Sequence, residues 1–234
     1  MLLPIECPHD IIAVLSGALA IEVSITDGDA QIAEVVGPHA GILRVDSLGA
    51  AHRPVRLRAL IPTTVTRLSE LEFRQLLAAD AQLACRLADA LCDRAAELRG
   101  RLLARSVRSA RRRVAHAVLY LLDRIGVACP LAPGSRLAVS QATIAETAGI
   151  ARQTANRALH ELQALGLLHL ESQMVRVLDR PGLETLAQGS RLRDVRAPAA
   201  GCKLTHPAEP LSCHPRKVVP VTLVRRSLRQ VVQG

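Results

Sequence analysis

A glycine separates two predicted helices in the second half of the chain, and this arrangement constrains the fold more than any other feature. Residues 140–148 predict a helix that begins at a capping serine, and Gly149 then turns the chain. A second helix follows over about residues 152–165 and ends at Gly166. Residues 167–178, LLHLESQMVRVL, predict two short strands around a turn. This order of elements predicts a winged helix-turn-helix, with three leucines packing the second helix: Leu159, Leu162 and Leu165.

Long hydrogen-bonding side chains occupy the first two turns of the second helix. In a helix-turn-helix this helix enters the major groove of DNA with its amino end first, so its early residues reach base edges. Arginine bonds guanine through two hydrogen bonds, and glutamine bonds adenine in the same way. We therefore expect Arg152, Gln153 and Arg157 to read bases in double-stranded DNA. Four polar neighbours are expected to contact the DNA backbone or to support the helices: Ser140, Gln141, Thr154 and Asn156.

The charge of the chain is uneven along its length. Residues 1–100 carry 9 arginines and 13 acidic residues, while residues 101–188 carry 12 arginines and 6 acidic residues. Residues 189–234 carry 9 basic and 2 acidic residues. An acidic first part and a basic remainder favour a sensing or dimerising part followed by a part that binds a polyanion. The alternatives at this point are basic charge that only aids solubility and a plain helical hairpin with a solvated basic face.

The first part of the chain alternates short apolar runs with turn residues over positions 12–72. The sequences VSI at 23–25 and VRLRA at 55–59 alternate with period two, as half-buried strands do. Asp27-Gly28 predicts the turn of a tight hairpin between two such runs. Several short strands at this spacing predict an antiparallel β-roll, and we expect residues 1–78 to form a sensor domain.

A leucine stripe follows on one face of a predicted long helix: Leu83, Leu87, Leu91, Leu98 and Leu102. This spacing indicates a seam like that of a coiled coil, interrupted by Arg94, so residues 79–108 are expected to form a dimerisation helix. An amphipathic helix packed on its own domain is the alternative. Cys85 and Cys92 share a face roughly opposite the stripe, so a disulfide across this seam is not expected.

Two serines predict helix starts on either side of the long helix. Ser69 is followed three residues later by Glu72, which is the pattern of a capping box. Ser109 is expected to cap a helix that buries five apolar residues: Val114, Val118, Leu121, Leu122 and Ile125. The break between the long helix and this one, which is rich in arginine, predicts a domain boundary, with residues 109–188 as the DNA-binding domain.

The sequence VSQATIAETAGIARQTANRALHELQALGLLHL resembles the DNA-binding signature of the Crp/Fnr transcription regulators. The matching residues are Ile144, Ala145, Gly149, Arg152, Thr154, Arg157, Leu159 and Leu162. Upstream, LSGALAIEV and SELEFRQLL resemble the family's roll hairpin and the short helix that follows it, so the resemblance covers about residues 11–187. It implies an α+β fold with an N-terminal antiparallel β-roll, a long dimerisation helix and a C-terminal winged helix-turn-helix. It also implies a cytoplasmic homodimer that binds a palindromic promoter site and contacts RNA polymerase.

Two departures from the family pattern have physical consequences. Where the family has Ser/Thr-Arg-Glu, this chain has Ala151, Arg152 and Gln153. The helix cap is lost at Ala151, which costs about 0.5–2 kcal/mol locally. Gln153 replaces a carboxylate that would accept a hydrogen bond from cytosine, so we expect a different operator sequence.

The expected effector pocket is degenerate in this chain. Family members that bind cyclic nucleotides hold the ribose and phosphate with Gly-Glu-Leu and a later Arg-Ser or Arg-Ala. At the position of Gly-Glu-Leu this chain has Gly41, Ile42 and Leu43, so the glutamate carboxylate that would bind the ribose is missing. The second falls near His52-Arg53-Pro54, and the proline has no backbone N–H to donate. We therefore expect no binding of cyclic nucleotide, and the sequence names no other cofactor.

Other interpretations of the sensor stay open at this point. Cys7 and His9, with His39 and His52, leave room for a haem- or thiol-based gas or redox sensor. A ligand-binding module without promoter control is a second alternative. Little sequence precedes the first predicted strand of the roll. Two further alternatives are therefore an incomplete effector pocket and a wrongly assigned first residue of the protein.

Several classes of function are not expected from this sequence. The six cysteines are scattered without a Cys-x-x-Cys pair, and no metal site is predicted, since Cys202, His206, Cys213 and His214 match no zinc spacing. No catalytic motif appears, so we expect no enzyme. The longest apolar run is too short and too interrupted to cross a membrane, and a cytoplasmic protein is expected. The basic, proline-containing residues 189–234 are expected to be disordered and to add non-specific affinity for DNA.

Overall fold

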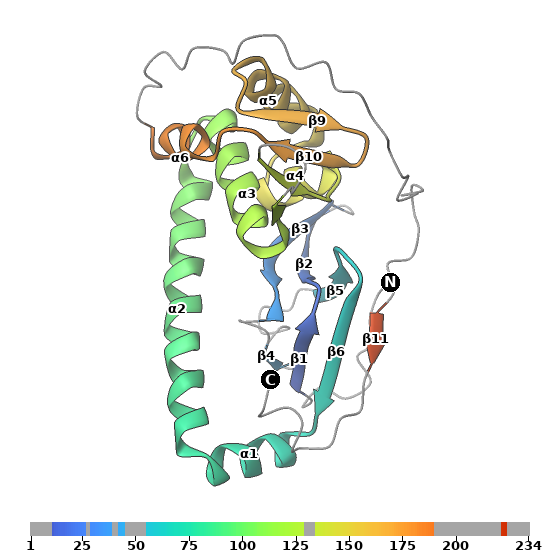
Figure 1. Ribbon diagram of the computed structural model, residues 1–234, viewed down its shortest axis with the longest axis vertical. Helices are drawn as coiled ribbons and strands as arrows, with labels where there is room; N and C mark the ends of the chain where they lie inside the picture. Colours follow the sequence, from blue (N-terminus) through green and yellow to red (C-terminus); the bar gives the residue numbers. More distant parts are fainter. Residues whose placement is uncertain are drawn as a thin grey trace. The chain divides into compact units, whose positions relative to one another are not determined.

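The computed structural model describes residues 11–26, 29–38, 42–44, 55–128, 134–189 and 221–223. The chain divides into two compact units. Unit 1 comprises residues 1–106 and 219–234, and unit 2 comprises residues 107–218. Figure 1 shows unit 1 as two small sheets with a long helix, and unit 2 as a cluster of helices with a small sheet. Together they form the mixed fold expected from the sequence.

Unit 1 holds two sheets of short strands. In spatial order the first consists of β11 (Val221–Leu223), β6 (Thr63–Leu68), β1 (Ile11–Ser16) and β4 (Ile42–Arg44). The second consists of β3 (Asp29–Val36), β2 (Leu19–Thr26) and β5 (Val55–Ala59). Apart from β11, all neighbouring strands run antiparallel, as predicted.

Period-two alternation creates the core of unit 1. Leu57 and Ala59 are buried, whereas Arg56 is exposed and Arg58 is half-buried, so the alternation predicted for this strand is confirmed over residues 56–59. A single aliphatic cluster joins both sheets: Ile12, Val14, Leu19, Ile21, Val36, Leu57, Ala59 and Val65. The β2–β3 hairpin is also present, with Thr26 opposite Asp29. The predicted turn at Asp27-Gly28 lies outside the described residues.

A glycine is required where β1 turns into β2. Gly17 has a φ of +82°, a backbone conformation that residues with a side chain rarely adopt. A Cβ atom there would lie 2.3 Å from the carbonyl oxygen of Pro62. The hydroxyl of Thr63 fixes the same corner, because it accepts from the N–H of Ala18 at 3.1 Å. The two sheets are therefore joined where the chain passes from one to the other.

Two consecutive helices complete the main body of unit 1. Helix α1 (Glu70–Ala79) begins with the predicted capping box: Glu72 N–H donates to Ser69 Oγ at 3.2 Å, and Ser69 N–H donates to the Glu72 carboxylate at 2.8 Å. Helix α2 (Ala81–Ser106) follows after one residue and has no buried residue. Among the described residues, no helix combines the length and the apolar character needed to cross a membrane.

Three arginines hold α2 against strand β3. Arg94, which interrupts the leucine stripe, donates from Nη2 to the Glu34 carboxylate at 2.7 Å. Arg105 donates to the Ile32 carbonyl oxygen at 2.7 Å, and Arg101 donates to the carbonyl oxygens of Ile32 and Ala33. The contact with Glu34 therefore explains why an arginine interrupts the leucine stripe, which the heptad spacing alone does not explain.

Unit 2 is built on helix α3 (Ala110–Ile125). The other helices are α4 (Gln141–Ala148), α5 (Arg152–Ala164) and α6 (Arg180–Gln188). A four-stranded sheet has the spatial order β7 (Val127–Ala128), β8 (Ser135–Leu137), β10 (Met174–Val177) and β9 (Leu168–Glu171). The predicted hairpin is β9–β10, while β7, β8 and α6 were not predicted from the sequence.

The predicted burial in unit 2 is confirmed for all but one residue. Ser109 caps α3 by accepting from the N–H of Arg112, and the five apolar residues expected inside on this helix are buried. Leu159 and Leu162 of α5 are fully buried. Leu165 was expected to pack with them, but it is 43% exposed. The reason is that α5 ends at Ala164, so Leu165 belongs to the turn that leaves the helix.

The C-terminal segment contains a strand that was not expected. Residues 189–234 were predicted to be disordered, but Val221–Leu223 form β11 and pair in parallel with Thr63–Val65 of β6. The expectation of disorder therefore does not hold for these three residues. Residues 190–220 and 224–234 lie outside the described part of the chain.

We predict that Leu159→Ala lowers the free energy of unfolding of unit 2 by about 2–5 kcal/mol, because truncating a fully buried leucine leaves a cavity. Leu165→Ala is the matched control on the same segment and should change the free energy by about 0.5 kcal/mol or less. Urea unfolding followed by circular dichroism measures both. Equal effects of the two substitutions would contradict the arrangement of α5.

Candidate nucleic-acid interface

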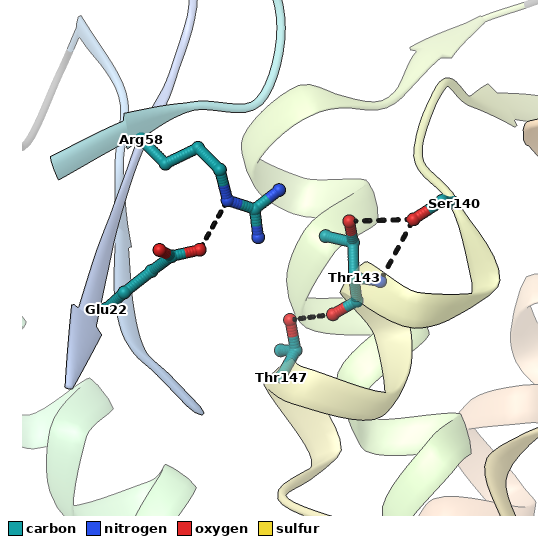
Figure 2. Close-up of polar contacts among 5 residues, drawn as sticks. All are labelled: Glu22, Arg58, Ser140, Thr143 and Thr147. Carbon is teal, nitrogen blue, oxygen red and sulfur yellow. Dashed lines mark hydrogen bonds and ion pairs between the residues drawn. The ribbon is translucent and has the colours of Figure 1, made fainter. Parts of the chain in front are cut away.

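Helix α4 begins at a hydroxyl cap that also orders its first two turns. Ser140 Oγ accepts from the N–H of Thr143 at 3.1 Å and lies 3.1 Å from the Thr143 hydroxyl (Figure 2). One turn later, the Thr147 hydroxyl donates to the Thr143 carbonyl oxygen at 2.7 Å (Figure 2). Ser140 was expected to support the helices or contact DNA, and the structure places it as the cap of α4. Gln141, the first residue of the helix, is half-buried.

The turn between α4 and α5 depends on a left-handed glycine. Gly149 has a φ of 64° and a ψ of 43°, and its N–H donates to the carbonyl oxygen of Ala145. The N–H of Ile150 donates to the same oxygen at 3.2 Å. This confirms the predicted turn at Gly149. The chain then enters α5 at Ala151, which makes no side-chain capping bond, as the sequence indicates.

Helix α5 separates a buried face from a face of exposed polar side chains. Its buried residues are Ala155, Ala158, Leu159 and Leu162. The three predicted base-reading residues, Arg152, Gln153 and Arg157, are exposed, and so is Thr154. Since Gln153 and Arg157 are four residues apart, they are neighbours on one side of the helix, whereas Arg152 projects on an adjacent side. The amino end of α5 therefore carries exposed hydrogen-bonding side chains opposite its buried face.

Asn156 differs from the other polar residues of α5. It is half-buried, and its side-chain oxygen is buried without a hydrogen-bond partner among the described residues. An unpaired buried amide oxygen is uncommon and costs free energy. Of the four residues expected to contact the DNA backbone or to support the helices, only Thr154 is exposed, while Ser140, Gln141 and Asn156 are half-buried.

Two arginines in the first turn of α3 make contacts near this site that were not expected from the sequence. Arg113 donates to the carbonyl oxygens of Ala148 and Gly149, and Arg112 donates to that of Ala187. Burial lowers the pKa of the Arg113 guanidinium from its ordinary value. The sequence showed only a run of arginines at a domain boundary, because no local pattern indicates partners 35 and 75 residues away.

The predicted effector pocket lies mostly outside the described residues. Gly41, His52 and Arg53 are not described, whereas Ile42 and Leu43 lie in β4, opposite Ala13 and Ile12 of β1. The described part of the roll contains two largely buried carboxylates, Glu22 and Glu34, and each is paired with an arginine. Glu22 is bonded to Arg58 of β5 (Figure 2), and Glu34 to Arg94 of α2. The pocket therefore remains a prediction from the sequence.

The predicted dimer stripe is only partly covered within unit 1. Leu91 and Leu102 are 51% and 67% exposed, and Leu83, Leu87 and Leu98 are half-buried. Cys85 and Cys92 are exposed free thiols on the same helix. Among the described residues, no group of three or more His, Cys, Asp or Glu side chains lies close enough to hold a metal ion.

Comparisons with known proteins identify the C-terminal domain and the fold. The family model described as the Crp-like helix-turn-helix domain matches residues 112–186. A CRP-family transcriptional regulator from Thermus thermophilus is similar in structure, with a TM-score of 0.65 and 20% sequence identity over 81% of this chain and 93% of that chain. FixK2 from Bradyrhizobium japonicum gives a TM-score of 0.62 and 22% identity over 77% of this chain and 88% of that chain.

A third similar structure is a mutant of CooA from Carboxydothermus hydrogenoformans. Its TM-score is 0.62, and the identity is 17% over 80% of this chain and 84% of that chain. No curated protein matches the sequence. The family model and the structural neighbours together confirm the resemblance to the Crp/Fnr regulators and the fold that it implies.

Proposed function

Since residues 112–186 form a Crp-like helix-turn-helix domain on the fold of Crp/Fnr transcription regulators, we propose that the protein binds a specific promoter sequence as a homodimer. The observation that carries this proposal is the exposure of Arg152, Gln153 and Arg157 in the first two turns of a helix whose opposite face is packed into unit 2. Such a helix presents base-reading groups without loss of its own core. RNA polymerase is the partner expected of a regulator at a promoter.

Dimerisation through α2 is supported by its exposed leucines. The helix is 26 residues long, none of its residues is buried, and Leu91 and Leu102 lie eleven residues apart, which places them on one face. A two-fold axis across this face brings the two copies together along the helix. The dimer then presents two recognition helices to the half-sites of a palindrome, about 34 Å apart.

The sensor domain is proposed not to bind cyclic nucleotide. The position expected to supply a carboxylate to the ribose is Ile42 of strand β4. An aliphatic side chain cannot accept the hydrogen bond that a ribose hydroxyl would donate. Downstream, Pro54 lacks the N–H that would face the phosphate.

Arg152→Ala is predicted to weaken binding to the specific site by about 1–3 kcal/mol and to relax the preference at one position in each half-site. The reason is the loss of a two-bond contact to one base. The probe is a duplex selected by the unmodified protein from random-sequence DNA, compared by fluorescence anisotropy with single-base variants of itself.

Arg111→Ala is the matched control, since Arg111 is also exposed and carries the same charge but lies on α3. A residue that meets only phosphate would weaken binding to all sequences alike and lower the salt slope by about one. If Arg152→Ala leaves both affinity and preference unchanged, α5 is not the recognition helix.

The double variant Leu91→Lys, Leu102→Lys is predicted to be monomeric and to lose tight binding to the palindrome, because two charges would be buried in the proposed seam. Light scattering measures the mass, and unchanged circular dichroism shows that the units remain folded. Leu71→Lys is the control, because Leu71 is 66% exposed but lies on α1. A double variant that remains dimeric would place the interface elsewhere.

Titration calorimetry with cyclic AMP and cyclic GMP is predicted to give no heat of binding at concentrations up to about 1 mM, where a ligand with micromolar affinity would saturate. The Ile42→Glu variant tests the cause, since it restores a carboxylate to the position where the sequence lacks one. Micromolar binding by the unmodified protein would show that other groups hold the ribose.

A further inference from the structure

We propose that Arg113 is a positioning residue for DNA recognition: it fixes the turn between α4 and α5 from outside, where Ala151 provides no helix cap. This inference rests on the proposed function, because it explains how the base-reading side chains of α5 are held in place. Arg113 itself belongs to α3 and is not among the residues expected to touch DNA.

The contacts of Arg113 are concentrated at the carboxyl end of α4. Its Nη2 donates to the carbonyl oxygens of Ala148 and Gly149, each at 2.7 Å, and its Nε also donates to Ala148 at 3.2 Å. Carbonyl groups in the last turn of a helix have no partner within the helix and carry its partial negative charge. A guanidinium is suited to this place because it carries several N–H donors in one plane and a full positive charge.

The other side of the turn has no comparable support. In α5 the capping position is Ala151, and a methyl group cannot accept from the first N–H groups of the helix. Only Ile150 separates this residue from Gly149, whose carbonyl oxygen Arg113 holds. The charged contact therefore acts on the same short segment that a serine or threonine cap would otherwise fix.

The arginine is presented from a rigid part of unit 2. Val114, Ala115, Ala117 and Val118 of α3 are all buried, so the backbone that carries Arg113 is packed on the core. The adjacent Arg112 donates from Nε and Nη2 to the Ala187 carbonyl oxygen of α6, at 3.1 and 3.0 Å. Two consecutive residues of α3 thus bond the carboxyl ends of two different helices.

Base recognition is sensitive to this support, because productive contacts tolerate errors of only about 0.5 Å and 10–20°. Phosphate attraction is long-ranged and tolerates larger displacements. Loosening the turn should therefore reduce discrimination between sequences more than it reduces the general affinity for DNA.

The experiment compares Arg113→Gln with Arg111→Gln in the full-length protein. Both remove one positive charge from the first turn of α3, but Arg111 is exposed. The first measurement is hydrogen exchange of the Gly149 and Ile150 amides without DNA, since both donate to Ala145. The second is the ratio of affinities for the selected duplex and its single-base variants.

Arg113→Gln is expected to accelerate exchange of the turn amides and to reduce the discrimination ratio, each by about fivefold, which is the size of a lost helix cap. Arg111→Gln should change neither. Arg113→Lys should recover part of both effects, because an ammonium can still donate to one carbonyl. Adding Ala151→Ser to Arg113→Gln should restore discrimination, because it supplies the missing cap at the other side of the turn.

If Arg113→Gln behaves like Arg111→Gln in both measurements, the inference is overturned. If Arg113→Gln does not fold, Arg113→Lys with and without Ala151→Ser provides the same comparison. If the unmodified protein shows no sequence preference while the turn amides still respond to Arg113→Gln, the contact is supported and the proposed function fails. A sequence preference that survives alongside unresponsive amides overturns the positioning role alone.

Discussion

Guanidinium groups bonded to main-chain carbonyl oxygens set the position of helices in both units. In unit 1, Arg101 and Arg105 bond strand β3 from helix α2, and in unit 2, Arg112 and Arg113 bond the ends of α6 and α4. The cores themselves are aliphatic, since the chain has one phenylalanine, one tyrosine and no tryptophan. Aliphatic packing is tolerant of small rotations and shifts. Directional bonds to fixed oxygens therefore contribute the orientation that the cores alone define less sharply.

The elements specified by neighbouring residues could be predicted from the sequence. Three such features depend on contacts within four residues: the capping box at Ser69, the cap at Ser109 and the turn at Gly149. The sequence predicted all three, and the structure contains them. The exposure of Arg152, Gln153 and Arg157 on α5 also followed from helical spacing. The carbonyl partners of Arg112 and Arg113 and the strand β11 could not be predicted, because they depend on pairing across 35 residues or more.

The leucine stripe of α2 shows why periodicity alone leaves two possibilities open. A helix packed on its own domain and a helix in a dimer seam produce the same spacing. In this structure three of the five leucines are half-buried in unit 1, while Leu91 and Leu102 remain largely exposed. The arginine within the stripe faces β3. Three leucines of the stripe thus pack within unit 1, and Leu91 and Leu102 are the ones left exposed for the proposed seam, a distinction that spacing alone does not make.

Strand β11 has a consequence for how the protein behaves at high concentration. It covers β6 along Thr63–Val65, so this part of the sheet is not presented as an open edge. Open edges are templates on which strands of other molecules assemble into insoluble aggregates. The residues that form β11, VTL at 221–223, favour strands, and Pro220 directly before them limits how far this strand extends. Pairing makes β11 the edge strand of this sheet in place of β6, and a strand of three residues offers few groups to an incoming strand.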